Sequence, residues 1–145
     1  MKKNEQAFEE LSALFFELKQ AIRDSLPQSQ RPDPNAWMRC ETIRFIGEHG
    51  SPSMQEIAKH LRVTAPSATS LVGKLQRLGW VERTSSPKDK RTVQIVLSKK
   101  GHIELTRYRA QSRTIMQKVF GGLSDNDLRD LRRIFAAVSN RTPAP

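Results

Sequence analysis

The chain has 145 residues, a length typical of one domain with or without helical extensions, and 37% of its residues are hydrophobic. Its formal net charge of +10 favours polyanionic partners, and its single cysteine excludes an internal disulfide framework. No apolar run reaches membrane-spanning length and the segment after Met1 does not resemble a signal peptide, so we expect a cytoplasmic protein that does not bind membranes.

The N-terminal part predicts two helices separated by a linker. Residues 4–25 have an amphipathic pattern, and three prolines within residues 27–34 interrupt it. A second helix is expected from a cap at Asn35 to about Glu48, followed by a turn over residues 49–52. The apolar face of the first helix consists of Phe8, Leu11, Leu14, Phe15, Leu18 and Ile22.

Residues 53–79 contain two predicted helices joined by a tight turn. The first begins at a capping box, in which the Ser53 hydroxyl and the Glu56 carboxylate each accept a backbone N–H. After a turn at residues 62–63, Thr64 caps the second helix, and Gly79 ends it. Its predicted buried stripe is Ala68, Leu71, Val72, Leu75 and Leu78. Its opposite face carries small or hydrogen-bonding residues and then cations: Pro66, Ser67, Thr69, Ser70, Gly73, Lys74 and Arg77.

A predicted β-hairpin follows, with strands over residues 80–84 and 92–97. Its polar loop presents Lys88, Lys90 and Arg91 together at the tip. Helix, turn, helix and basic hairpin form the layout of a winged helix-turn-helix, whose second helix fits a DNA major groove. Residues 59–100 hold 10 Lys/Arg and 2 Asp/Glu, a net charge of +8, so the charge is concentrated in this unit. The predicted DNA-binding residues are Thr64, Pro66, Ser67, Thr69, Ser70, Lys74, Arg77, Lys88, Lys90 and Arg91.

The C-terminal part predicts two more helices. Ser98 caps a long helix through about Phe120, glycines 121 and 122 stop it, and Ser124 caps the last helix. The tail from Arg141 is expected to be frayed. The last helix has an apolar stripe of Leu128, Leu131, Ile134, Phe135 and Val138.

The terminal stripes need a surface to bury against, and pairing with a second copy is favoured over a monomer that folds them onto its own core. We therefore predict a mainly α fold with a small β-hairpin wing and N- and C-terminal dimerisation helices. The predicted parts are an N-terminal dimerisation helix and linker (1–34), a winged helix-turn-helix DNA-binding domain (35–100) and C-terminal dimerisation helices (101–145).

Other candidate sites carry weaker patterns. No nucleophile–base pair, paired-carboxylate motif or phosphate-binding glycine loop is present, so neither an enzyme nor a cofactor is expected. Cys40 and the three histidines match no metal-ligand spacing, and a buried structural thiol is favoured over a redox sensor at Cys40. Phe15, Trp37 and Tyr108 are candidates to line a pocket for a small aromatic effector, although for each of them a place in the core is favoured.

The run from Glu56 to Arg83, followed by Pro87-Lys-Asp-Lys-Arg91 and Val96-Leu-Ser-Lys-Lys-Gly101, resembles the MarR family of bacterial and archaeal transcription regulators. The resemblance implies a triangular homodimer with interleaved terminal helices, and recognition-helix contacts to DNA from Ser67, Thr69, Ser70 and Lys74. It implies that Arg91 enters the minor groove, that Asp89 braces the wing through an ion pair, and that a small, often phenolic, ligand or an oxidant releases DNA.

The sequence departs from the family pattern at several positions. Ser70 stands where a longer basic residue is common, Gly73 where an acidic one is common, and Ser98 where threonine is usual. The family's peroxide sensors have a reactive cysteine in the first helical region, where this chain has none. The favoured function is a dimeric, sequence-specific repressor of transcription. The alternatives are a weakly selective DNA-compacting protein and a winged-helix protein-interaction module.

Overall fold

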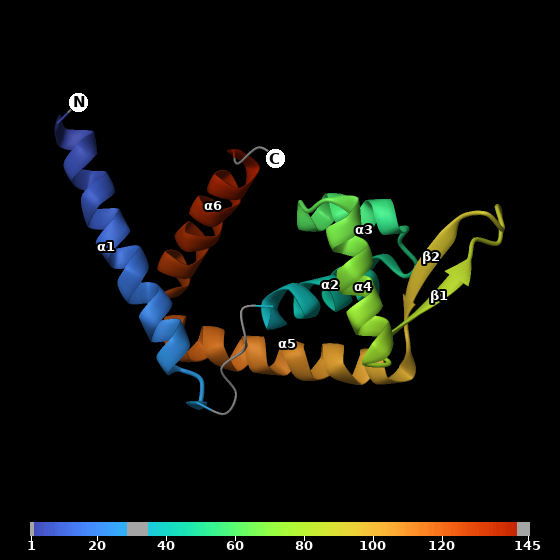
Figure 1. The fold of residues 1–145 in the computed structure, drawn as a ribbon. Helices are drawn as coiled ribbons and strands as arrows, with labels where there is room; N and C mark the ends of the chain where they lie inside the picture. Colours follow the sequence, from blue (N-terminus) through green and yellow to red (C-terminus); the bar gives the residue numbers. More distant parts are fainter. Residues whose placement is uncertain (1, 29–34, 142–145) are drawn as a thin grey trace. The chain divides into compact units, whose positions relative to one another are not determined.

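The computed structural model describes residues 2–28 and 35–141, so most of the predicted linker and the last four residues lie outside the described residues. The described residues form six helices and one hairpin, and the predicted mainly α fold with a β wing is confirmed (Figure 1). The elements are α1 (Lys2–Asp24), α2 (Ala36–His49), α3 (Met54–Leu61), α4 (Ala65–Arg77), β1 (Val81–Ser85), β2 (Val93–Leu97), α5 (Lys99–Phe120) and α6 (Asp125–Arg141).

The chain divides into two units, and the division falls within α5. One unit combines α1 with residues 112–139, and among the described residues the other takes 35–111 and 140–141. The second unit contains α2, α3, α4, the hairpin and the first part of α5. The dimerisation and DNA-binding roles assigned to residues 1–34, 35–100 and 101–145 stay predictions.

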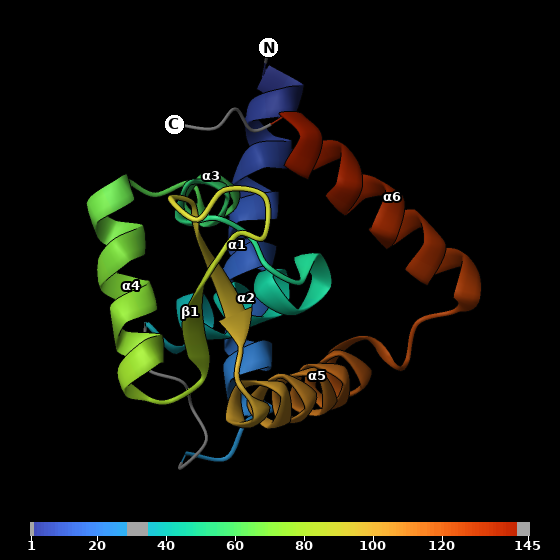
Figure 2. The same ribbon diagram turned by 90° about the vertical axis from the view of Figure 1, so that its right-hand side faces the viewer.

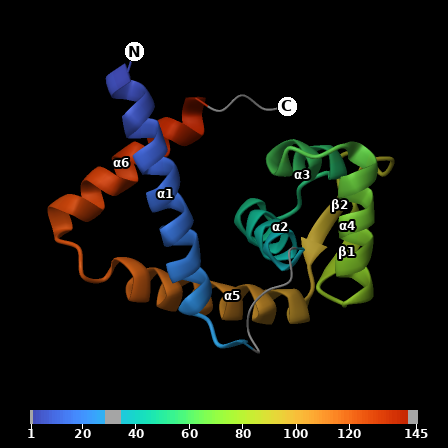
Figure 3. The same ribbon diagram turned by 60° about the vertical axis from the view of Figure 1, so that its left-hand side comes forward.

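The hydrophobic core of the second unit takes side chains from all of its elements. Figure 2 shows α4 beside the hairpin, and Figure 3 shows α2 beside α3. The strands pair antiparallel with Val81 opposite Leu97 and Ser85 opposite Val93. The core consists of Ile43, Phe45, Ile46, Ile57, Val72, Leu75, Val81, Ile95 and Leu105. Burial of these apolar side chains makes the main contribution to holding α4 in place.

The predicted helix starts are confirmed where a side-chain oxygen caps the first turn. Ser53 and Glu56 form both hydrogen bonds of the capping box, at 3.2 and 2.7 Å. Ser98 accepts the Gly101 N–H at 3.0 Å, and Ser124 accepts the Asp127 N–H at 3.2 Å. The cap predicted for α2 is wrong, because the residue before Ala36 has helical geometry and makes no side-chain cap hydrogen bond.

Several apolar residues of α4 and the hairpin lie beyond the part of these elements that the core covers. Leu78 is 41% exposed because it lies at the C-cap of α4, beyond the last buried turn. Val93 is 44% exposed because it pairs with Ser85 at the loop end of the hairpin, away from the core. Leu71 is only partly buried. None of the helices described is long and apolar enough to cross a membrane.

Candidate nucleic-acid interface

Helix α4 has one fully buried face and one exposed face. Ala68, Val72 and Leu75 are each 0% exposed and fix the rotation of the helix about its axis. The backbone at Thr64 is extended and its hydroxyl accepts the Ser67 N–H at 3.4 Å, which starts the helix at Ala65. The exposed face carries the side chains predicted to contact DNA: Pro66, Ser67, Thr69, Ser70, Lys74 and Arg77.

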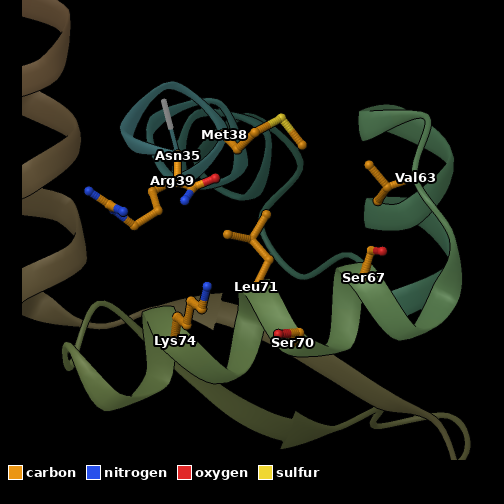
Figure 4. A pocket seen from close by; sticks show the side chains of 8 residues that line it. All are labelled: Asn35, Met38, Arg39, Val63, Ser67, Ser70, Leu71 and Lys74. Carbon is orange, nitrogen blue, oxygen red and sulfur yellow. The ribbon is translucent and has the colours of Figure 1, made fainter. Parts of the chain in front are cut away.

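The hydroxyl groups on this face differ in how far they are already engaged. Thr64 and Ser67 share a hydrogen bond of 2.9 Å between their hydroxyl oxygens. The Thr69 hydroxyl donates to the Ala65 carbonyl at 2.9 Å, so only its acceptor lone pairs face outward. The Ser70 hydroxyl makes no hydrogen bond to the rest of the described chain and can both donate to and accept from a base. Figure 4 shows Ser67 and Ser70 on this helix.

The wing loop is held by its own hydrogen bonds. The Ser86 N–H donates to the Thr92 carbonyl at 2.9 Å, and the Thr92 N–H donates to the Asp89 carbonyl at 3.0 Å. The Asp89 carboxylate accepts the Arg91 N–H at 2.9 Å and the Thr92 hydroxyl at 3.3 Å. Within residues 35–141 it forms no ion pair, so the bracing implied for Asp89 takes the form of hydrogen bonds instead.

The cations of the interface have no carboxylate partner in the described part of the chain. There are five such cations, two on α4 and three on the wing, and the side chains of all five are exposed. An unpaired guanidinium or ammonium at a surface is free to neutralise a phosphate and release counterions. The basic wing and the C-terminal half of α4 therefore form a positively charged surface of Lys74, Arg77, Lys88, Lys90 and Arg91.

A hollow of about 260 Å³ lies between the start of α2 and α4 (Figure 4). Its apolar walls come from Met38, Val63 and Leu71, and its cations are Arg39 and Lys74. Ser67 and Ser70 belong both to this hollow and to the exposed face of α4. A small ligand with an apolar body and a negative group would suit this lining. Met38 and Arg39 were not predicted as site residues, because sequence periodicity does not show which helix faces meet.

The residues predicted to line an effector pocket do not line this hollow. Phe15 is 62% exposed and Trp37 is 61% exposed, so the core position favoured for each of them is wrong. Tyr108 is partly buried and packs against the core, as expected. Phe15 and Trp37 stand on helix faces that no core side chain covers, a distinction that an amphipathic pattern cannot make.

Ionisable side chains on α2 are engaged in structural contacts. Burial raises the pKa of the Cys40 thiol, which disfavours the reactive thiolate, although Arg39 partly offsets this effect. Partial burial by itself opposes ionisation of Glu41, but hydrogen bonds from Arg44 and His60 outweigh it and lower the pKa of that carboxyl. No group of three or more metal-ligating side chains occurs among the described residues.

Comparison with known proteins shows which family this chain resembles. A sequence profile described as "MarR family" matches residues 37–92. The HTH-type transcriptional repressor IacR of Pseudomonas putida is 26% identical over 100 residues, which cover 69% of this chain and 60% of IacR. The HTH-type transcriptional repressor MdtR of Bacillus subtilis is 22% identical over 139 residues, which cover 96% of this chain and 90% of MdtR.

Solved structures share the fold. FabT of Streptococcus pneumoniae in complex with DNA has a TM-score of 0.73 and 23% identity, and the match covers 94% of this chain and 95% of FabT. A mutant MarR of Escherichia coli complexed with operator DNA has a TM-score of 0.70 and 22% identity, over 89% of this chain and 93% of that one. Over residues 37–92 the chain is therefore similar in sequence to the MarR family of transcriptional regulators, and it shares the winged helix-turn-helix fold of the solved structures.

Proposed function

We propose that this protein is a dimeric, sequence-specific double-stranded DNA-binding transcription regulator that acts as a repressor and is relieved by a small ligand. The observation that carries the proposal is the exposed face of α4, where small hydroxyl side chains are followed by Lys74 and Arg77, beside an internally hydrogen-bonded basic wing. Relatives named as HTH-type transcriptional repressors support the direction of regulation.

The two elements would read different features of DNA. Short side chains at the start of α4 permit close approach to base edges in the major groove, and Ser70 retains a donor and an acceptor for them. Arg91 would enter a narrow minor groove, where A·T-rich sequence concentrates negative potential. Lys88 and Lys90 are compact, strongly hydrated charges that suit phosphates. The solved complexes of FabT with DNA and of MarR with operator DNA use the same fold, which supports this docking mode.

Dimerisation is supported by the apolar side chains that the chain leaves uncovered. Phe8 is 67% exposed and Leu14 is 59% exposed on α1, while Phe135 and Val138 on α6 are 49% and 60% exposed. Exposed apolar stripes of this kind mark interaction surfaces, and a second copy is the partner that presents the same surface. Deletion of residues 1–26 should give a monomer or an aggregate with poor operator binding. A soluble deletion variant that binds DNA like the full chain would rule out this interface.

Ligand relief is supported by the position of the hollow. Ser67, Ser70 and Lys74 line it and also stand on the proposed DNA-reading face, so an occupant would compete for the same side chains. A small aromatic carboxylate fits the pairing of Leu71 and Met38 with Arg39 and Lys74. The wall with Arg39 and Met38 would then bind the ligand more directly than Phe15, Trp37 or Tyr108.

The test is to select bound fragments from genomic DNA and then to measure Kd for the selected site and for random DNA at several salt concentrations. A specific regulator should bind its site roughly 10³-fold or more tightly than random DNA at physiological salt. Equal affinity for both would support the DNA-compacting alternative. Failure to bind any DNA would leave the protein-interaction module.

A further inference from the structure

Resting on the function proposed above, we propose that Lys100, together with Ser98, is a positioning residue that holds the C-terminal end of the recognition helix α4 for sequence-specific binding. These residues stand at the start of α5, outside the surface formed by α4 and the wing. Their effect on DNA binding would act through the backbone of residues 78–80.

Three consecutive carbonyl groups after α4 each accept a hydrogen bond from Lys100 in the first turn of α5 or from Ser98, the residue before it. The Lys100 Nζ donates to the Leu78 carbonyl at 3.0 Å, and the Ser98 hydroxyl donates to the Gly79 carbonyl at 2.5 Å. The Ser98 N–H donates to the Trp80 carbonyl at 3.0 Å. Carbonyl groups at a helix C-terminus have no partner within the helix, and Lys100 supplies a donor to the one at the C-cap of α4, Leu78. The bond from Ser98 to Trp80 extends the pairing of β1 with β2 by one residue, and the bond from the Ser98 hydroxyl fixes Gly79 between α4 and β1.

Lys100 is a cation in the first turn of α5, a position that is unfavourable for α5 itself, and its hydrogen bond to the end of α4 accounts for this position. A cation in the first turn of a helix is opposed by the partial positive charge of that helix end, and α5 has no acidic residue in its first turn. The same cation is favourable at the C-terminus of α4, where the carbonyl groups carry partial negative charge. Lys100 therefore stabilises α4 at the expense of α5, which is the arrangement expected of a residue that serves the recognition helix.

The path of the side chain agrees with this role. A Cβ at Gly79 would lie 3.8 Å from the Lys100 Cδ, so the aliphatic part of the lysine passes beside Gly79 on its way to the Leu78 carbonyl. Gly79 has φ +74°, a conformation that glycine adopts without strain, and it turns the chain from α4 into β1. The Lys100 side chain thus lies beside the residue at which the chain turns from the recognition helix into the wing.

The test compares Lys100→Met with Lys99→Met, a matched control because Lys99 is exposed and makes no contact of this kind within the described chain. Each variant is titrated as the full chain against the selected DNA site and random DNA over a salt series. We expect Lys100→Met to lose roughly tenfold in affinity for the selected site, with little loss on random DNA and an unchanged salt slope. Lys99→Met should keep the wild-type ratio between the two DNAs.

Two results would overturn the proposal. Equal losses on both DNAs, with a salt slope reduced by about one, would identify Lys100 as a phosphate contact. A lower melting temperature with wild-type affinity for both DNAs would show that Lys100 serves stability only.

Amide hydrogen exchange without DNA provides a second measurement. The N–H groups of Leu78, Gly79 and Trp80 donate to carbonyls of the last turn of α4, at 2.9 to 3.0 Å. Their exchange should accelerate in Lys100→Met and stay unchanged in Lys99→Met, and unchanged exchange in both variants would refute the proposed contact. If wild-type protein fails to discriminate between DNAs while the exchange result holds, the function proposed above fails and the positioning of α4 stands.

Discussion

The Asp89 carboxylate accepts the backbone N–H of Arg91 at 2.9 Å, so an acidic residue fixes the backbone of a cation that we propose contacts DNA. Asp89→Ala should weaken binding to the selected site by about 1 kcal/mol, roughly fivefold in Kd, because the loop loses this hydrogen bond and the one from Thr92. Asp89→Asn should keep most of the affinity, because the amide oxygen can still accept the Arg91 N–H.

Titration of both Asp89 variants with the selected site distinguishes loop geometry from charge. Each variant removes one negative charge next to DNA, which by itself favours binding to a polyanion. If Asp89→Ala binds more tightly than wild type at every salt concentration, Asp89 acts by repulsion only and the wing does not depend on its hydrogen bonds.

Ser70 and Thr69 are neighbours on α4 whose hydroxyl groups differ in availability. The Thr69 proton is donated to the Ala65 carbonyl at 2.9 Å, whereas Ser70 has no partner in the described chain. Ser70→Ala should therefore cost about 1–3 kcal/mol on the selected site and little on random DNA, the range of a good base contact. Thr69→Ala should cost less. Competition binding with both DNAs measures the difference, and a larger loss for Thr69→Ala would contradict this assignment.

The starts of α3, α4, α5 and α6 could be predicted from sequence because the chemistry of a side-chain cap is local. Ser53 and Glu56, or Ser98 and Gly101, lie three residues apart, so the capping partners are visible in the sequence. Lys100 and Leu78 are 22 residues apart, and nothing in the local pattern indicates that they meet. The same limit applies to the hollow, because its lining depends on how α2 packs near α4.

Periodicity likewise predicted which helix face is apolar but not what covers it. Ala68 and Phe15 both lie on apolar stripes, yet Ala68 is fully buried and Phe15 is 62% exposed. A stripe is buried only as far as the chain supplies a facing surface, and a sequence pattern contains no information about that surface. The exposed face of α4 could be predicted because the elements that cover its apolar face, α3 and β1, are its neighbours in the sequence.

Glu41 links α2 to α3, and its ionisation should make the free energy of unfolding depend on pH in the acidic range. Its carboxylate pairs with Arg44 and with His60, which stacks on Phe45 at a centroid distance of 4.1 Å. Because these contacts lower the pKa of Glu41 below its usual value near 4.5, they stabilise the fold above that pH. The contribution is lost as pH falls from about 4.5 through the lowered value in the folded protein.

Urea unfolding at several pH values tests the role of Glu41. Glu41→Gln should lower the free energy of unfolding near neutral pH by about 1–3 kcal/mol, and the difference from wild type should narrow in acid. Glu82→Gln, which changes an exposed carboxylate without an ion pair among the described residues, is the control. A Glu41→Gln deficit that stays constant from neutral pH to about pH 3 would show that its cause is packing, not charge.

Gly101 allows α5 to start directly against the chain that leaves α4. A Cβ at this position would lie 1.9 Å from the Trp80 carbonyl oxygen, which is backbone and cannot rotate away. Gly101→Ala should therefore lower the free energy of unfolding by about 1–3 kcal/mol or more. Gly122→Ala is the matched control, because a Cβ there would meet nothing within 4 Å. Thermal unfolding compares the two, and equal melting temperatures would contradict the close contact at Gly101.

Gly73 lies in the interior of α4, where an acidic residue is common in the family that this chain resembles. A Cβ there would meet only the Arg77 Nη1, at the ordinary contact distance of 3.6 Å, so alanine fits without strain. Gly73→Ala should raise the free energy of unfolding by about 1 kcal/mol, because glycine is the poorer helix former. The same methyl group occupies space between the α4 backbone and any duplex that approaches it, so affinity for DNA should fall.

Gly73→Ala is therefore expected to raise the free energy of unfolding and to lower the affinity for DNA. Urea unfolding measures stability and titration with selected and random DNA measures binding, each on Gly73→Ala and Gly73→Ser. Serine is a weaker helix former than alanine and carries a hydroxyl that can bond to bases or phosphates, so it should recover part of the binding but less of the stability. If Gly73→Ala binds both DNAs as tightly as wild type while gaining stability, the backbone of α4 does not approach the groove closely at this position.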